Sequence, residues 1–200
     1  PSSLVFCHSS FRIFVKNYIS MKILVTYAFD EEILPFEIQG CELTFLKTGM
    51  GKVLSAFNLT KALCENRYDL VLNVGTAGTL NHKVGDIFVC HRFVDRDMEK
   101  IELPGVCKDI SFPEKVGVDV VDNYEQIGIV NTGDSFVTEV GHFNGDVIDV
   151  EAFAQAQVCK EMDITFVSVK YVTDIIGQNS GEIWLDKLRD ARESLKAFFA

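Results

Sequence analysis

Carboxylates follow or flank several apolar runs of this 200-residue chain, and they are the side chains best suited to chemistry. The triplet Asp30-Glu31-Glu32 comes after the apolar run 22–27, and Asp174 lies near the end of the run 164–175. A third group, Asp149-Val150-Glu151, opens a segment with a helical pattern. Removing a carboxylate from water is costly unless it has partners, so several that converge indicate a functional site.

Each acidic group also has a simpler interpretation. The triplet could open a helix, where the helix dipole favours negative charge. Asp149 could be an ordinary N-cap with Glu151 in the first turn, and Asp174 could cap the turn that follows it. Spacing alone does not decide between these roles and a shared site.

Three glycine-containing turns accompany the acids. The segments 75–78 and 133–136, with the sequences GTAG and GDSF, each follow an apolar run, and GMGK occupies 49–52. None of them is a GxxxxGK[ST] phosphate loop or a GxGxxG dinucleotide fingerprint. Taken singly, each could be only a turn between a strand and the next element.

The surrounding pattern predicts which elements must position these groups. Apolar runs alternate with helical patterns, which indicates a parallel or mixed sheet covered by helices on both faces. In such sheets ligands bind beyond the carboxyl ends of the strands. We predict strands at 22–27, 41–49, 69–78, 85–97, 127–137 and 164–175, and helices at 51–66, 150–162 and 182–199.

Composition excludes several classes of protein. The net charge of −10 argues against a nucleic-acid surface, which needs clustered Lys and Arg. No apolar run approaches the roughly 18 residues that a membrane span needs. The six cysteines and four histidines are scattered, so we expect free thiols in a reducing compartment and no metal site.

Residues 1–20 differ from the rest of the chain. Met21 opens the run MKILVTY, and the preceding segment lacks the pattern of a signal peptide. We interpret 1–20 as an upstream or non-native extension and 21–200 as a single domain. The alternative is an additional edge strand at 11–15.

Six segments occur in a recognisable order along the chain: KTGMGKVLSAFN, LNVGTAGTL, KVGDIFV, NTGDSFV, VIDVEAFAQAQVC and VSVKYVTDI. They resemble those of the nucleoside phosphorylase/nucleosidase superfamily, and most of all the methylthioadenosine/S-adenosylhomocysteine nucleosidases. The resemblance implies a three-layer α/β/α fold around a twisted mixed sheet, in a cytoplasmic homodimer. It also implies that water cleaves the N-glycosidic bond of a small adenine nucleoside, without a cofactor or metal.

The resemblance also implies roles for individual residues. Glu32 would activate the water, Glu151 would hold the ribose hydroxyls and stabilise a cationic sugar, and Asp174 would pass a proton to the purine N7. These are the three tasks that an oxocarbenium-like cleavage requires. The remaining substrate contacts would be Thr76 beside the water, Ala77, Gly78, Phe136 stacked on the base, the backbone of Val137, Val150, Met50, Phe29 and Lys170.

Departures from the family pattern leave alternatives open. Related phosphorylases place an Arg where this chain has Asn73, and the loop after Tyr27 is acidic, so water is the favoured nucleophile over phosphate. The segments before Cys41 and between Asp97 and Phe112 are shorter than usual, and these segments help to shape the pocket. Alternative functions are futalosine hydrolysis, purine nucleoside phosphorolysis, and nucleoside binding without catalysis.

Overall fold

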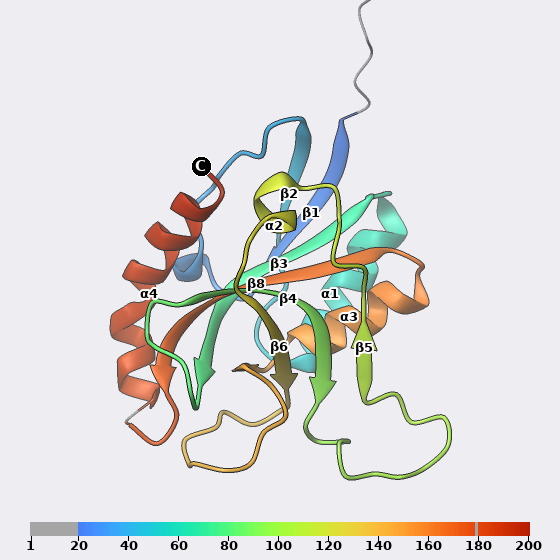
Figure 1. Ribbon diagram of the computed structural model, residues 1–200. Helices are drawn as coiled ribbons and strands as arrows, with labels where there is room; N and C mark the ends of the chain where they lie inside the picture. Colours follow the sequence, from blue (N-terminus) through green and yellow to red (C-terminus); the bar gives the residue numbers. More distant parts are fainter. Residues whose placement is uncertain (1–19, 179) are drawn as a thin grey trace, which may run out of the picture.

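A computed structural model describes residues 20–178 and 180–200 (Figure 1). The interpretation of residues 1–19, including the possible edge strand, lies outside the described residues, and the domain assignment stays a prediction. The strands are β1 (Met21–Tyr27), β2 (Cys41–Lys47), β3 (Leu70–Thr79), β4 (Ile87–Asp95), β5 (Asp109–Ser111), β6 (Ile127–Thr132), β7 (Val147–Asp149) and β8 (Thr165–Ile175). The helices are the 3₁₀ turn η1 (Asp30–Glu32) and α1 (Lys52–Glu65), α2 (Asp119–Asp122), α3 (Ala152–Glu161) and α4 (Ser180–Phe198).

The described strands form one mixed sheet that closes on itself. Its order is β2-β1-β3-β7-β6-β4-β5, and β8 pairs with both β3 and β4. The strands β3, β8, β4, β6 and β7 therefore make a barrel-like ring, from which β1 and β2 extend. The pairs β3–β8 and β6–β7 are parallel, so the carboxyl ends of these strands meet pairwise at one edge.

Alternation along the strands divides the core into two layers. On β1, Ile23 and Val25 belong to one apolar cluster, whereas Leu24 belongs to the other. The same alternation on β3 places Leu70 and Leu72 in the first cluster and Val71 in the second, on the other face of the sheet. Successive side chains of a strand point to opposite faces, so near-continuous apolar runs are what a sheet buried on both faces requires.

Helices cover both faces of the sheet. The long helix α4 lies on one side, with Ala191 and Leu195 fully buried among the first cluster, and α1 and α3 lie together on the other (Figure 1). Phe153 of α3 is buried with Leu59 of α1 in the second cluster. This arrangement confirms the predicted three-layer α/β/α architecture.

The differences from the predicted elements lie at strand ends and in very short elements. The strand expected at 41–49 ends at Lys47, and Gly49 and Gly51 have φ of +78° and +86°, a left-handed region that favours glycine. The strand expected at 127–137 ends at Thr132, and the next residue, Gly133, donates its backbone N–H to the carbonyl of Asp149 at the end of β7. The strands β5 and β7, with three residues each, are too short for a periodic pattern to reveal.

Candidate active site

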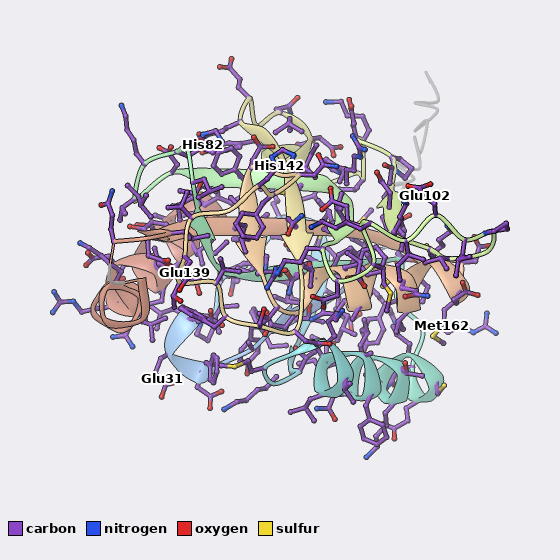
Figure 2. All side chains as sticks on the ribbon, turned by 90° about the horizontal axis from the view of Figure 1, so that it is seen from below. Glu31, His82, Glu102, Glu139, His142 and Met162 are labelled. Carbon is purple, nitrogen blue, oxygen red and sulfur yellow. The ribbon has the colours of Figure 1, made fainter. Side chains whose placement is uncertain are left out.

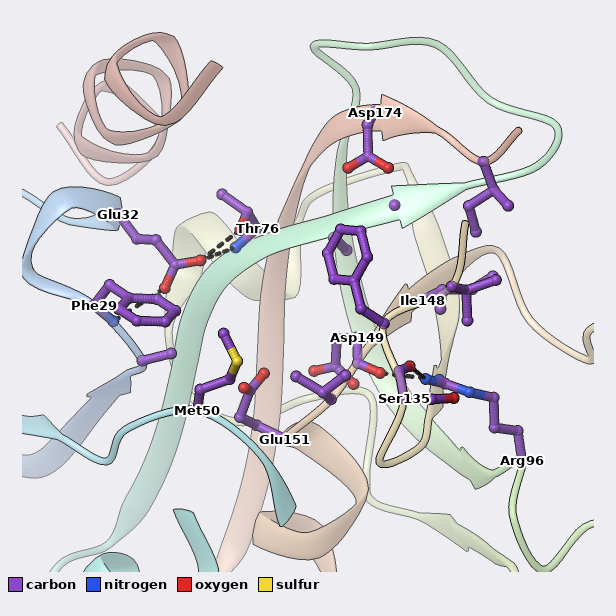
Figure 3. Close-up of a pocket in the computed structure, with 17 residues that line it drawn as sticks. Phe29, Glu32, Met50, Thr76, Arg96, Ser135, Ile148, Asp149, Glu151 and Asp174 are labelled. Carbon is purple, nitrogen blue, oxygen red and sulfur yellow. Dashed lines mark hydrogen bonds between the residues drawn. The ribbon is translucent and has the colours of Figure 1, made fainter. Parts of the chain in front are cut away.

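The ends of several strands border one pocket. It encloses about 640 Å³, including the space at its mouth, a size typical of small-molecule sites. Figure 3 shows Glu32 and Arg96 at opposite ends of this pocket, with Asp174 and Glu151 on different sides between them. The lining residues are Ala28, Phe29, Glu32, Met50, Thr76, Ala77, Gly78, Arg96, Ser135, Phe136, Val137, Ile148, Asp149, Val150, Glu151, Asp174 and Ile176.

Only one acid of the triplet 30–32 reaches the pocket. Asp30 and Glu31 are exposed, and Figure 2 shows Glu31 at the outer edge of the molecule. Glu32 is 4% exposed. Its Oε2 accepts from the backbone N–H of Phe29 at 3.2 Å, which closes the short turn η1 and directs the carboxyl group inward.

Thr76 holds the other oxygen of Glu32. The backbone N–H of Thr76 donates to Glu32 Oε1 at 3.3 Å, and the Thr76 hydroxyl donates to the same oxygen (Figure 3). Burial raises the pKa of Glu32 above its ordinary value, against the hydrogen bonds from Thr76 and the positive charge of Lys170, which lower it. A fixed, desolvated carboxyl group of this kind is a suitable general base for a bound water.

Glu151 lies at the start of α3 and faces the turn between β2 and α1. Its Oε1 accepts from the backbone N–H of Gly51 at 2.9 Å. Burial and the neighbouring charge of Asp149 raise the pKa of Glu151 to about 8, although Lys170 acts in the opposite direction. The carboxyl group of Glu151 therefore holds a proton more tightly than an exposed glutamate does.

Lys170 lies behind the wall of the pocket rather than in it. Its Nζ makes an ion pair with Asp149 Oδ2 at 2.8 Å, and the two side chains are 2% and 1% exposed. Burial lowers the pKa of Lys170, but Asp149 and Glu151 outweigh it and hold the pKa above its ordinary value. The ammonium group of Lys170 is thus bound to Asp149 and absent from the pocket lining, and the substrate contact that the resemblance implies for it stays a prediction.

Asp174 is buried where β8 passes β3. It is 3% exposed, and Thr173 Oγ1 donates to its Oδ1 at 2.9 Å. A Cβ atom on Gly78 would lie 3.1 Å from Asp174 Oδ2, so the glycine leaves room for the carboxyl group against the neighbouring strand. The register shift between Ala77 and Gly78 accompanies this close approach.

The mouth of the pocket is apolar and more open. Met50 and Phe136 are each 50% exposed, whereas the acids and Thr76 are nearly buried. Phe29, Val137 and Val150 also line the pocket. Apolar side chains near the mouth and acids deeper in the pocket are the arrangement expected for a ligand that has both a flat apolar part and a reacting bond.

Two functional side chains were missed as such by the sequence analysis. Asp149, predicted only as a member of the acidic group 149–151 or as a helix cap, accepts from the backbone N–H of Ala152 at 3.0 Å, and it also lines the pocket and binds Lys170. Arg96 follows directly after β4 and was not considered. The signal that could have found it is its position, since it stands at the carboxyl end of a buried strand between two aspartates. Also unpredicted in the lining are Ala28, Ser135, Ile148 and Ile176.

Asn73 stands where related phosphorylases have an arginine, and its side chain is buried within the sheet. Its amide oxygen accepts from Ser168 Oγ at 2.7 Å, and its amide nitrogen donates to the Thr26 hydroxyl at 3.3 Å. These contacts leave the neutral side chain directed at neighbouring strands.

Among residues 20–178 and 180–200, no helix is long and apolar enough to cross a membrane.

Sequence comparison places this fold and pocket in a known family. A sequence profile of the phosphorylase superfamily matches residues 30–200. The chain therefore belongs to the phosphorylase superfamily. Its relatives include a 5′-methylthioadenosine/S-adenosylhomocysteine nucleosidase of Bacillus subtilis, with 33% identity over 72% of this chain and 73% of the relative.

Solved structures give the same fold. A 5′-methylthioadenosine/S-adenosylhomocysteine nucleosidase of Helicobacter pylori superposes with a TM-score of 0.77 at 19% identity, covering 90% of this chain and 96% of that one. Futalosine hydrolase of the same organism also gives a TM-score of 0.77, at 18% identity, covering 89% and 96%. At such identities the two structures agree on the fold and do not distinguish between substrates.

Proposed function

We propose that this protein hydrolyses the N-glycosidic bond of an adenine thionucleoside, such as methylthioadenosine or S-adenosylhomocysteine, in the cytoplasm. The observation that carries the proposal is that Glu32, Glu151 and Asp174 come from three separate elements and line one pocket. Family membership and the nucleosidase relatives at about 30% identity support it.

Each acid has surroundings suited to one task. Glu32, held by Thr76 and Phe29, orients and deprotonates the water. Glu151 binds the ribose hydroxyls and, in its ionised form, stabilises the positive charge that develops on the sugar. Asp174 donates a proton to the purine N7, so that adenine leaves as a neutral base, which is typically worth about 10²–10⁴-fold in rate.

The open end of the pocket supplies recognition. Phe136 stacks on the base, and the backbone of Val137 reads its Watson–Crick edge. Met50 and Phe29 contact the ribose and the 5′ substituent, and Val150 packs beneath the ribose. Thr76, Ala77 and Gly78 form the opposite wall, where their β3 backbone runs beside the acids.

The assay for this function uses the wild-type protein with methylthioadenosine and S-adenosylhomocysteine, with and without phosphate, and follows free base by chromatography. We expect adenine in both buffers and the free thioribose product. A phosphate requirement with formation of a ribose 1-phosphate would establish a phosphorylase instead. Parallel reactions with futalosine and inosine test the alternative substrates. If none of the nucleosides released its base, nucleoside binding without catalysis would be the remaining function.

We also propose that the protein is a homodimer in which α1 faces the partner. Three apolar side chains of α1, together with one from the turn just before it, are exposed at helical spacing, between 48% and 82%. Met50, at one end of the row, also lines the pocket, so a second copy seated there would border the pocket mouth. The four residues, here called the α1 stripe, are Met50, Val53, Leu54 and Phe57.

Light scattering tests the dimer. The wild-type protein should have twice the mass of the 22.4 kDa chain. Phe57→Glu should give the monomer, because dimerisation would bury the unpaired charge of the glutamate in the interface. Leu103→Glu is the matched control, since Leu103 is also an exposed apolar residue, at 67%, but lies outside α1. A monomeric wild-type protein would refute the assembly.

A further inference from the structure

Arg96 fixes a segment that the proposed function uses for base recognition. Its Nη1 donates to the backbone carbonyls of Asn131, at 3.1 Å, and Asp149, at 3.0 Å. Its Nη2 donates to the carbonyl of Ser135, the residue immediately before Phe136. One guanidinium group therefore joins the ends of β6 and β7 to the segment that carries Phe136 and Val137.

The neighbours of Arg96 complete this attachment. Asp97 Oδ2 accepts from the backbone N–H of Asp134 at 2.9 Å and from Lys52 Nζ at 2.6 Å. Gly133 donates to the carbonyl of Asp149 at 3.3 Å. Three consecutive residues, 133–135, are thus anchored just before the residues that line the pocket mouth.

Gly133 allows the guanidinium group to lie where it does. A Cβ atom at this position would come within 2.5 Å of Arg96 Nε and within 2.6 Å of its Cγ. Because the Cγ atom is close to the root of the side chain, the arginine would have to leave its position to make room. Gly133 is not among the glycines with a positive φ, so alanine suits its backbone and disturbs mainly Arg96.

We propose that Arg96 is a positioning residue for base specificity, which holds segment 133–137 in the conformation that receives the purine. The proposal rests on the proposed function, since it assumes that the base binds at Phe136. An arginine suits this task, because its planar group presents several donors in a fixed geometry and keeps its charge in a partly buried site. Without the guanidinium group, the segment would have to be ordered when the base binds, and the entropy cost of this ordering would weaken binding.

The test compares Arg96→Ala, Gly133→Ala and the double variant, with Arg92→Ala as the matched control. Arg92 lies on β4, the strand that Arg96 follows, and pairs with Asp109 at the surface, outside the pocket lining. We expect the dissociation constant for adenine, measured by calorimetry, to rise about tenfold in each single variant, as for a recognition loop that must be reordered on binding. The double variant should be no weaker than Arg96→Ala, because Gly133→Ala acts through the arginine.

Hydrogen exchange distinguishes positioning from general stability. Amides of segment 133–140 should exchange faster in Arg96→Ala, whereas those of β1 and β3 should not change. Faster exchange throughout the chain, additive effects of the two substitutions, or unchanged adenine affinity would each overturn the proposal. Failure of the wild-type protein to bind adenine or release it from any nucleoside would instead contradict the proposed function.

Discussion

The floor of the pocket and its rim are built in opposite ways. The floor consists of Glu32, Thr76, Glu151 and Asp174, all at most 8% exposed, and the rim consists of Met50 and Phe136, each half-exposed. Floor residues are held by hydrogen bonds from strands and short turns, whereas the rim lies on connecting segments. The difference shows that groups assigned to proton transfer are desolvated and fixed, while those assigned to recognition stay accessible to an arriving ligand.

The largest effect should come from breaking the buried ion pair of Lys170 and Asp149, which lies behind the floor. Lys170→Met removes the partner of Asp149, and breaking a buried ion pair from one side typically costs about 3–5 kcal/mol. Urea unfolding should show a loss of this size, and Asp149→Asn in the same chain should recover part of it. Lys187→Met, which removes an exposed pair with Asp190, should lower the free energy of unfolding far less. Equal losses in the two lysine variants would contradict the distinction.

Asp174→Asn tests whether the floor supplies a proton. Asparagine is nearly isosteric and can hydrogen-bond to the base, but it has no carboxylic-acid proton. We expect kcat to fall by about 10²-fold or more while adenine binding is kept. If Asp174 were only a cap, asparagine would serve equally well and turnover would stay near normal.

The floor should also make stability depend on pH. The pKa of Glu151 is raised from its ordinary value of 4.5 to about 8, chiefly by burial, so the folded protein binds a proton that the unfolded chain releases. The contribution is fully present below pH 4.5 and is lost as the pH rises through about 8. Urea unfolding of the ligand-free protein at several pH values should therefore give a free energy that falls over this range. Glu151→Gln should flatten the dependence, and an unchanged slope would remove Glu151 as its source.

Changes at the rim should be milder and should affect binding. Phe136→Ala removes the stacking surface, and base–aromatic stacking is worth about 1–3 kcal/mol. Steady-state kinetics should show KM rising about tenfold with a smaller change in kcat. Val140 is 75% exposed and lies in the same connection between β6 and β7. Val140→Ala is the control and should leave both constants unchanged. A large fall in kcat for Phe136→Ala would make the rim part of the chemistry.

Most of the fold was predictable because long apolar strands and amphipathic helices carry periodic patterns. β8, with 11 residues, and α4, with 19, lie close to their predicted ranges. The three residues of β7 carry no such pattern, and their pairing with β6 depends on the position of a distant segment. The role of Arg96 was not predicted because its partners lie in distant segments. These partners are backbone carbonyls, which any residue type could provide.

The sequence alone determined the residue types that are available, their order, and the family they indicate. Only the tertiary structure decided how Phe29 and Thr76 hold Glu32, that Lys170 pairs with Asp149 behind the pocket, and that Arg96 turns toward segment 133–135. The physical reason is that burial and hydrogen-bond partners come from residues far apart in the chain. Glu32 meets Thr76 across 44 residues, and the side chain of Arg96 meets Asp149 across 53.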